Sequence, residues 1–406
     1  MTVLSAELIA RNMVNQMTFL DPTELDKQTR TFYFGIDPSA DSMQIGNLAA
    51  AMVVRQFMMH GYKAILLVGG ATGLIGDPDG KKQERDLKDQ ATIDQNVAGI
   101  TKEYQRIFEG MPFEVVNNYD WFRGIGYLDF LREVGKNVSL TQMLDREFVK
   151  ERIGEGGTGI SYAEFSYSLI QGYDFLHLFR DKGATLQLAG ADQWGNSVAG
   201  AQLIRKLEGG EAHVFTTPLI VNKQTGVKFG KSEGGAIWLN PDKTSPYKLY
   251  QFWLNCDDET SEDLIKVYTT LDLETIGGLI AEQRENPGSR VLQRRLAHEV
   301  TGLVHGKERC DSVERVNEVL FGQADFASLQ DSDLELLSQE IPTVPSGALI
   351  DILVTAGTAK SNGDARRLIT SGAVSVNQQK VLEDQPISSK SLVKKGKNSF
   401  ILVLNA

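Results

Sequence analysis

Continuous apolar runs alternate with stretches of helical periodicity in the first 240 residues. Residues 32–36, 64–68 and 184–189 are short and strongly apolar, as in strands that are buried on both faces of a parallel sheet. Apolar residues at helical spacing follow the first run from Gly46 and the third run from Val198. The pattern predicts an α/β fold, with a Rossmann-like parallel-sheet domain over residues 1–240.

The remainder of the chain has a different pattern. Residues 246–320 keep helical spacing, residues 321–345 are acidic and end in two prolines, and residues 346–406 read as two helices followed by strands. We therefore expect an α-helical domain and then, after a linker, a small α+β domain. The expected boundaries are 241–320, 321–345 and 346–406. At the other end of the chain, residues 4–20 are predicted to form one amphipathic helix.

Charge is distributed unevenly along the 406 residues. The net charge is −11, whereas the segment from Pro345 to the end has eight basic and four acidic residues, which gives +4 for the tail and −15 for the rest. An acidic body with a basic tail is typical of a protein that holds a polyanion through a tethered module. A surplus of four charges is also unremarkable on a small domain, so the charge alone leaves both interpretations open.

The cysteines and the apolar segments limit the location of the protein. Cys256 and Cys310 fit no metal-ligand spacing and are too few for a disulfide scaffold, so no protein-bound metal is expected. Residues 1–17 lack a signal-peptide core, and no run approaches the roughly 18 apolar residues of a membrane span. The sequence predicts a cytoplasmic protein without a membrane partner.

Residues 31–48 form the most informative strand-loop-helix unit. They contain neither the glycine fingerprint of dinucleotide-binding proteins nor a P-loop. Instead, Tyr33 and Asp37 lie at the end of an apolar strand, and Gly35 leaves room for a ligand beside the backbone. Ligands of open α/β sheets bind beyond the carboxyl ends of the strands, and the N-terminus of the following helix favours anions.

Two further strand ends carry acids. Asp77 follows a glycine-rich segment, residues 69–76, in which the backbone is able to approach a ligand or another part of the chain. It is either a turn residue before proline or part of a site. Asp192 either caps the next helix or binds a ribose hydroxyl pair.

One helix face is unusually polar. Tyr167, Gln171 and Asp174 recur at i, i+4 and i+7 in an otherwise apolar helix. They form either a buried structural network or a pocket that binds a small polar ligand, and we favour the pocket. The cations of residues 80–85 and of the loop around Lys228 and Lys231 are either simply solvated or contact phosphate oxygens, since each group lies in or beside a glycine-rich segment.

Together these motifs resemble the bacterial tyrosyl-tRNA synthetases, a family of class I aminoacyl-tRNA synthetases. The resemblance covers residues from about 5 to 320, and the tail is similar to a small RNA-binding domain that the family usually carries. The segments that carry it are Tyr33-x-Gly35-x-Asp37-Pro38, the glycine-rich loop ending in Asp77-Pro78, the face Tyr167…Gln171…Asp174, Gly190-x-Asp192-Gln193-Trp194-Gly195-Asn196 and Lys228-Phe229-Gly230-Lys231-Ser232.

The resemblance implies a homodimeric tyrosine–tRNA ligase that activates L-tyrosine with ATP and transfers it to tRNA(Tyr). Tyr33 and Asp174 would hydrogen-bond the phenol. The other residues implied to hold tyrosine are Asp77, Tyr167, Gln171 and Gln193. Those implied to bind ATP are Gly35, Asp37, Ser39, Gln44, Gly46, Asn47, Gly190, Asp192, Lys228, Lys231 and Ser232. The residues implied to be catalytic are Lys81, Arg85, Lys228 and Lys231. They would draw the β and γ phosphates, together with the Mg²⁺ that ATP carries, away from the α phosphorus.

One position departs from the family pattern. Gln44 and Asn47 stand where the HIGH signature of class I synthetases has histidines, and Gln at the first position is unusual. Either Gln44 substitutes adequately or the protein is a paralogue with slowed activation, and the intact phosphate-side residues favour the first hypothesis. A non-catalytic RNA-binding protein would be expected to lose residues such as Asp174 and Lys231, which are both present. A tryptophan-specific enzyme is disfavoured by the pair Tyr33 and Asp174, which argues for a phenol.

Overall fold

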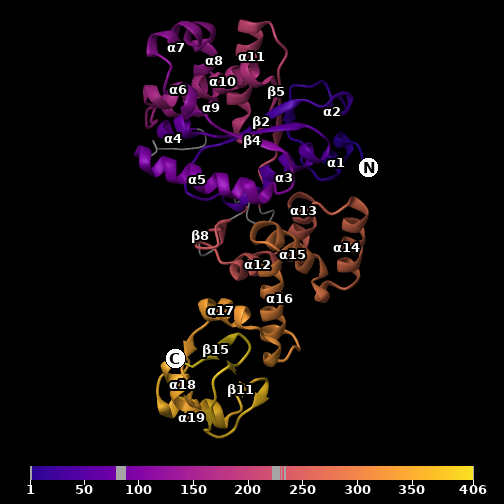
Figure 1. The fold of residues 1–406 in the computed structure, drawn as a ribbon, viewed down its shortest axis with the longest axis vertical. Coiled ribbons are helices and arrows are strands. Elements are labelled where there is room, and N and C mark those ends of the chain that lie inside the picture. Colours follow the sequence, from indigo (N-terminus) through magenta and orange to yellow (C-terminus); the bar gives the residue numbers. More distant parts are fainter. Residues whose placement is uncertain (1, 79–87, 222–228, 230, 233–234, 406) are drawn as a thin grey trace. The chain divides into compact units, whose positions relative to one another are not determined.

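The chain forms two compact units, residues 1–244 with 253–296 and residues 245–252 with 297–406. The computed structural model describes residues 2–405 except 79–87, 222–228, 230, 233 and 234 (Figure 1). Among the described residues, no helix combines the length and the apolar character that crossing a membrane requires.

The first unit is built on a six-stranded sheet with the order β1-β6-β5-β2-β3-β4. Strands β2 to β6 run parallel, and β1 pairs antiparallel with β6 at one edge. Because β2 leads to β3 and β4 on one side while β5 and β6 lie on the other, the order reverses between β2 and β5. The strands are β1 (Gln16–Met17), β2 (Thr31–Ile36), β3 (Lys63–Val68), β4 (Phe113–Asn117), β5 (Ala184–Gly190) and β6 (His213–Thr217).

Helices cover both faces of this sheet, with α3 and α5 on one face and α10 and α11 on the other (Figure 1). Alternate residues of β2 divide between them: Phe32 contacts Phe57 of α3, whereas Tyr33 contacts Phe175 of α10. Apolar side chains on both faces explain why the strands read as continuous apolar runs. The helices are α3 (Ile45–Met59), α5 (Gln90–Ile107), α10 (Tyr162–Lys182) and α11 (Trp194–Glu208).

Local signals set the ends and the packing of α10. Ser161 and Glu164 form a capping box at its start, and Gly183, with φ 66°, ends it in the left-handed conformation. A Cβ atom on Gly200 of α11 would lie 3.1 Å from Cβ of Phe175. The absence of a side chain at Gly200 therefore lets α11 approach α10 closely.

Between β4 and α10 the chain forms a series of short helices. They are α6 (Tyr119–Phe122), α7 (Tyr127–Glu133), α8 (Leu140–Leu144) and α9 (Glu147–Ile153). Arg152 donates two hydrogen bonds, each 2.9 Å long, to the carboxylate of Glu164, and both side chains are buried. This ion pair fixes α9 to the start of α10.

The prediction of one helix over residues 4–20 is wrong. Helix α1 (Leu4–Ala10) is followed by Asn12 at φ 56°, and residues 16 and 17 form β1. Asparagine tolerates the left-handed conformation that ends the helix. The buried Arg11 also donates hydrogen bonds to the carbonyls of Lys266 and Thr269, at the end of α13 (Asp258–Tyr268). These long-range contacts fix where the chain turns.

The second unit contains a five-stranded sheet with the order β12-β11-β14-β15-β9. Leu392 and Leu402 face a core with α16 and α17, while Val393 and Ile401 face a core with α18 and α19. Its strands are β9 (Thr343–Val344), β11 (Val374–Val376), β12 (Gln379–Lys380), β14 (Ser391–Lys395) and β15 (Ser399–Val403). Its helices include the end of α15 (Val291–His305), α16 (Lys307–Phe321), α17 (Asp331–Glu340), α18 (Leu349–Thr355) and α19 (Asn362–Thr370).

The segment predicted as a linker therefore contains an ordered helix. Leu334 and Leu337 of α17 are buried in the same core as Phe400 of the tail. Asp331 and Glu335 of this helix are exposed, whereas Asp333 is buried and accepts hydrogen bonds from Ser312 and Arg315 of α16. The domain boundaries themselves stay a prediction.

Candidate active site

A pocket of about 380 Å³ opens at the carboxyl ends of β2 and β5, where the strand order reverses. This is the position at which open α/β sheets bind ligands. The predicted site residues that line it are Tyr33, Gly35, Asp37, Ser39, Gln44, Gly46, Asn47, Asp77, Tyr167, Gln171, Asp174, Gly190, Asp192 and Gln193. Residues as distant in the sequence as Tyr33 and Gln193 thus share one cavity.

Tyr33 and Asp174 lie together in the buried part of the pocket wall, each 2% exposed. The Tyr33 hydroxyl has no hydrogen-bond partner among the described residues. Burial raises the pKa of both groups well above their ordinary values, and the charge of Asp174 adds to the rise for Tyr33. A buried hydroxyl near a buried carboxylate forms a binding site for a ligand group that both donates and accepts a hydrogen bond.

Asp174 is held in place by two donors from the segment after β4. Asn118 Nδ2 lies 3.1 Å from Oδ2, and Trp121 Nε1 lies 3.0 Å from Oδ1. The sequence interpretation gave no role to either residue. Their position directly after a buried strand was the available signal, because the ends of parallel strands meet at one edge.

A second network surrounds Asp37, at the end of β2. The Tyr167 hydroxyl donates to Oδ2 at 2.7 Å, and the Thr72 hydroxyl donates to Oδ1 at 2.6 Å. Thr72 lies in α4 (Gly70–Ile75), where a loop was expected. A Cβ atom on Gly69 would lie 2.4 Å from Asp37 Oδ1. Of the two uses expected for the glycine-rich segment, Gly69 therefore serves the close packing of another part of the chain, the end of β2.

Three carboxylates give this part of the pocket a negative potential. Burial raises the pKa of Tyr167 well above its ordinary value, and the charges of Asp37, Asp77 and Asp174 raise it further. Asp77 also accepts a hydrogen bond of 2.6 Å from Gln193 Nε2. An excess of carboxylates in a partly buried cavity favours a cationic ligand group, such as an ammonium.

Two amides from opposite sides also contribute to the cavity. Oε1 of Gln171 in α10 and Oε1 of Gln187 in β5 are buried and lack a hydrogen-bond partner among the described residues. Gln187 pairs in register with Tyr33 across the two strands. Gln171 was predicted from the helix face, whereas Gln187 was missed because it lies inside an apolar run.

The opposite side of the pocket is formed by the N-terminus of α3. The Gln44 backbone N–H donates to Asn47 Oδ1 at 3.0 Å, so Asn47 caps the helix while lining the pocket. Just before it, Glu103 of α5 accepts hydrogen bonds of 2.6 Å from the Ser42 hydroxyl and from the Met43 N–H. Burial raises the pKa of Glu103 to about 7. Glu103, another residue that the sequence did not indicate, thereby fixes the approach to α3.

The second strand end places Gly190 and Asp192 at the pocket. Asp192 lies in a short 3-10 helix, residues 191–193, and α11 begins at Trp194 without a side-chain cap. Asp192 therefore does not cap α11. A Cβ atom on Gly190 would lie 2.8 Å from Asp192 Oδ1, so glycine leaves space for that carboxylate.

Several predicted phosphate contacts lie outside the described residues. Lys81, Arg85 and Lys228 belong to such segments, and the side chains of Lys231 and Ser232 are likewise not described. The backbone of the last two forms β7 (Lys231–Ser232), paired with β8 (Gly235–Ala236). Their roles stay predictions.

Comparison with known families agrees with this architecture. The protein-family model described as tRNA synthetases class I (W and Y) matches residues 25–322. The parallel-sheet unit and its pocket therefore define a class I tRNA synthetase. The model described as Tyrosine–tRNA ligase SYY-like C-terminal domain matches residues 333–403.

Relatives that match nearly the whole chain show which family within this class it belongs to. A tyrosine–tRNA ligase of Bacteroides fragilis is 44% identical, over 98% of this chain and 98% of that protein. One of Anaeromyxobacter dehalogenans is 43% identical with the same coverage of both chains. The truncated mitochondrial tyrosyl-tRNA synthetase of Aspergillus nidulans superimposes with a TM-score of 0.71 at 28% identity, over 79% of this chain and 95% of that one. The chain belongs to the tyrosine–tRNA ligase family.

Proposed function

We propose that this chain activates L-tyrosine with ATP to tyrosyl-adenylate and pyrophosphate and then transfers tyrosine to the 3′ end of tRNA(Tyr). One observation carries the specificity: the unpaired Tyr33 hydroxyl near the buried Asp174. The phenol hydroxyl of the substrate donates to the carboxylate and accepts from Tyr33, which satisfies both groups. Phenylalanine would leave the Tyr33 hydroxyl unpaired, at a cost of about 1–3 kcal/mol, and would give Asp174 no donor beyond Asn118 and Trp121.

The remaining contacts orient the substrate. The carboxylates around Tyr167 suit the ammonium group of an amino acid, and Gln171 offers an unpaired buried oxygen to the same group. Gln193, held by Asp77, is proposed to lie beside the reacting carboxylate. With both ends of tyrosine fixed, its carboxylate is aligned toward the opposite wall of the pocket.

ATP is proposed to occupy that wall. Asp37, Gly190 and Asp192 would hold the adenosine part, and Ser39, Gln44, Gly46 and Asn47 would face the phosphates at the positive end of α3. Mg²⁺ would arrive with ATP and neutralise charge on the phosphates. Lys81, Arg85, Lys228 and Lys231 are the proposed cations for the leaving pyrophosphate.

The reaction needs no protein nucleophile. The tyrosine carboxylate attacks the α phosphorus in line, the bond to the bridging oxygen breaks, and pyrophosphate leaves with the electron pair. A terminal ribose hydroxyl of tRNA then attacks the carbonyl carbon and releases AMP. The rate derives from alignment and from stabilisation of developing phosphate charge, which accounts for a pocket lined by amides and a helix N-terminus.

ATP–pyrophosphate exchange with each amino acid tested separately checks this function. Exchange with tyrosine alone is the expected result. Exchange with tryptophan, the other amino acid of the matched class, would show that the chain is specific for tryptophan instead. Exchange with no amino acid would favour a non-catalytic RNA-binding protein.

The same assay resolves the role of Gln44. A neutral amide donates hydrogen bonds to phosphate oxygens but carries no charge, so the Gln44→His variant is expected to change the activation rate by less than about tenfold, or ~1.4 kcal/mol. A rise of several orders of magnitude would identify a paralogue with slowed activation.

We also propose a homodimer formed by the segment between β4 and β5. Large apolar side chains are exposed there: Tyr127 by 63%, Leu128 by 72% and Leu140 by 60%. Large exposed apolar side chains on neighbouring helices support a protein–protein interface here. Sedimentation of the Leu128→Asp variant as a monomer, with the wild type as a dimer, is the expected outcome. The proposed location is the cytoplasm, where tRNA is charged.

A further inference from the structure

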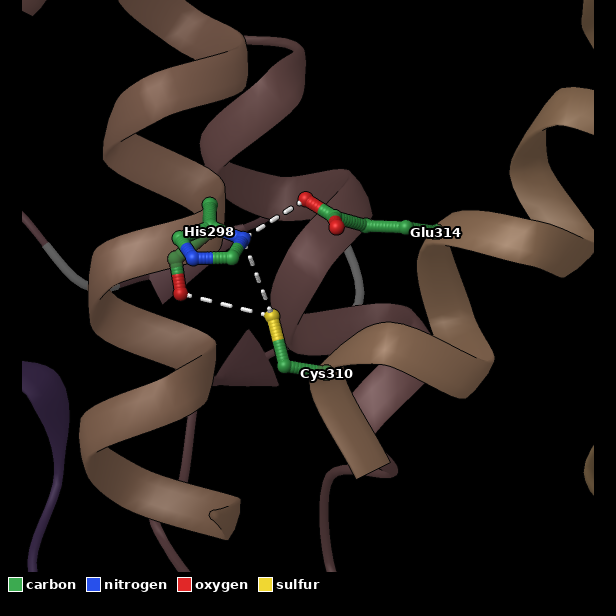
Figure 2. A group of neighbouring side chains, drawn as sticks. All are labelled: His298, Cys310 and Glu314. Carbon is green, nitrogen blue, oxygen red and sulfur yellow. Dashed lines mark hydrogen bonds and ion pairs between the residues drawn. The ribbon is translucent and has the colours of Figure 1, made fainter. Parts of the chain in front are cut away.

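Three metal-ligating side chains meet between α15 and α16, far along the chain from the pocket residues. His298 lies on α15, and Cys310 and Glu314 lie one turn apart on α16, so both face the same side. Figure 2 shows all three pointing toward one another. Their potential ligand atoms all lie within 4.8 Å of one another.

Two of the three separations between ligand atoms are near those of a tetrahedral site. His298 Nδ1 lies 2.9 Å from Glu314 Oε1 and 3.7 Å from Cys310 Sγ. Zinc bonds of about 2.0–2.1 Å to nitrogen, 2.0–2.2 Å to oxygen and 2.3 Å to sulfur, at tetrahedral angles, require separations of about 3.3 Å and 3.6 Å. The nitrogen–oxygen pair must therefore open by about 0.4 Å. The sulfur–oxygen pair, which lies within 4.8 Å, must come to about 3.6 Å, and rotation of the Glu314 side chain changes both separations.

The surroundings favour a cation. Three acidic side chains, Glu314, Asp311 and Glu299, act on the Cys310 sulfur electrostatically, and one cation, Lys307, opposes them. A thiolate and the Glu314 carboxylate together carry two negative charges, which equal those of a divalent ion. The cluster is also open to solvent on one side, because 42% of the His298 side chain and 36% of the Glu314 side chain are exposed.

We propose that His298, Cys310 and Glu314 bind a divalent transition-metal ion of the zinc type, with water in the fourth position. A set of one nitrogen, one sulfur and one oxygen suits Zn²⁺ or Co²⁺ and excludes Mg²⁺ and Ca²⁺, which prefer oxygen. On binding, the thiol proton, which points to the His298 carbonyl, passes to solvent. His298 would bind the metal through the Nδ1 lone pair of its neutral imidazole, with the ring proton on Nε2.

The proposed ion would clamp α15 to α16. The chain passes from one helix to the other through a sharp turn at Gly306, with φ 88°. One metal bond from α15 and two from α16 would add a cross-link about one to two helical turns from Gly306. Because the ion binds the folded chain, it would stabilise the second unit by mass action.

Cobalt is the probe for the test. The full-length chain, stripped with a chelator, is titrated with Co²⁺ and then with Zn²⁺. We expect a thiolate-to-cobalt charge-transfer absorption with one ion per chain, which Zn²⁺ abolishes, and a melting temperature that rises with Zn²⁺. The Cys310→Ser variant should lose both responses, whereas Cys256→Ser, which removes the other cysteine, should keep them.

Two variants at partly exposed positions guard against misfolding of Cys310→Ser. Glu314→Gln and His298→Gln should each weaken Zn²⁺ binding by at least about 100-fold, since even the partners of metal ligands cost about 10- to 100-fold when they are removed. A wild-type chain without the cobalt absorption, or an absorption retained in Cys310→Ser, would overturn the proposal and leave a hydrogen-bonded triad between two helices.

Discussion

Replacing Tyr33 with phenylalanine is expected to change stability and tyrosine recognition in opposite directions. The Tyr33 hydroxyl is buried and has no partner among the described residues. Removing such a group relieves a cost of about 1–3 kcal/mol, and water in the pocket lowers the gain to about 1 kcal/mol. The free energy of unfolding of Tyr33→Phe should therefore rise slightly.

Activity should fall by an amount set by the same hydroxyl. Without it, the substrate phenol loses one neutral hydrogen bond, worth about 0.5–1.5 kcal/mol. The kcat/KM of ATP–pyrophosphate exchange with tyrosine should drop by about 2- to 12-fold. With phenylalanine as substrate it should not drop, because the variant has no hydroxyl to leave unpaired.

The chain offers a matched control in α5. Tyr104 is fully buried, and its hydroxyl also lacks a partner among the described residues, but it does not line the pocket. Tyr104→Phe should show a similar gain in stability and unchanged exchange kinetics. If Tyr33→Phe instead unfolds more readily than the wild type while Tyr104→Phe does not, the Tyr33 hydroxyl has an intramolecular partner and the recognition argument fails.

Three further measurements test other parts of the structure. Burial raises the pKa of Glu103 from 4.5 to about 7, so between these pH values the folded state holds a proton that the unfolded state has lost. The free energy of unfolding should therefore fall as pH rises through this window, by about 3 kcal/mol. Denaturant unfolding at each pH measures the fall, which should be smaller in Glu103→Gln. Glu164→Ala leaves the buried guanidinium of Arg152 without its carboxylate partner, and it should lower the free energy of unfolding by about 3–5 kcal/mol in the same assay. The double variant with Arg152→Met should lose less, because no buried charge is left unpaired. Lys360 and Arg366 are exposed cations of the tail. Replacing both with glutamate should weaken tRNA charging and its salt dependence, while ATP–pyrophosphate exchange stays unchanged. An equal loss of charging and of exchange would contradict a tRNA role for the tail.

The sequence alone was enough for strands β2, β3 and β5 and for most of the polar residues that line the pocket. Buried parallel strands need apolar residues on both faces, so polar residues at their ends stand out. Tyr33, Asp77 and Asp192 were found in this way, and the strand ends converge because parallel strands share an edge. The polar face of α10 was equally visible, since helical spacing brings Tyr167, Gln171 and Asp174 to one side.

Tertiary structure decided what depends on contacts between distant segments. The N-terminal helix stops at Ala10 because Arg11 reaches carbonyls some 255 residues away, and α17 is ordered because its leucines meet the tail sheet. Asn118 and Trp121 acquire their role only when β4 is placed beside β3, near Asp174.

The clearest case is Cys310. Its sequence neighbourhood has no metal-ligand spacing, and no bound metal was expected there. Folding two helices around Gly306 brings His298, twelve residues earlier, to 3.7 Å from its sulfur. Periodicity describes the neighbours of a residue along one helix or strand, whereas a ligand set that spans two helices exists only once they are packed together.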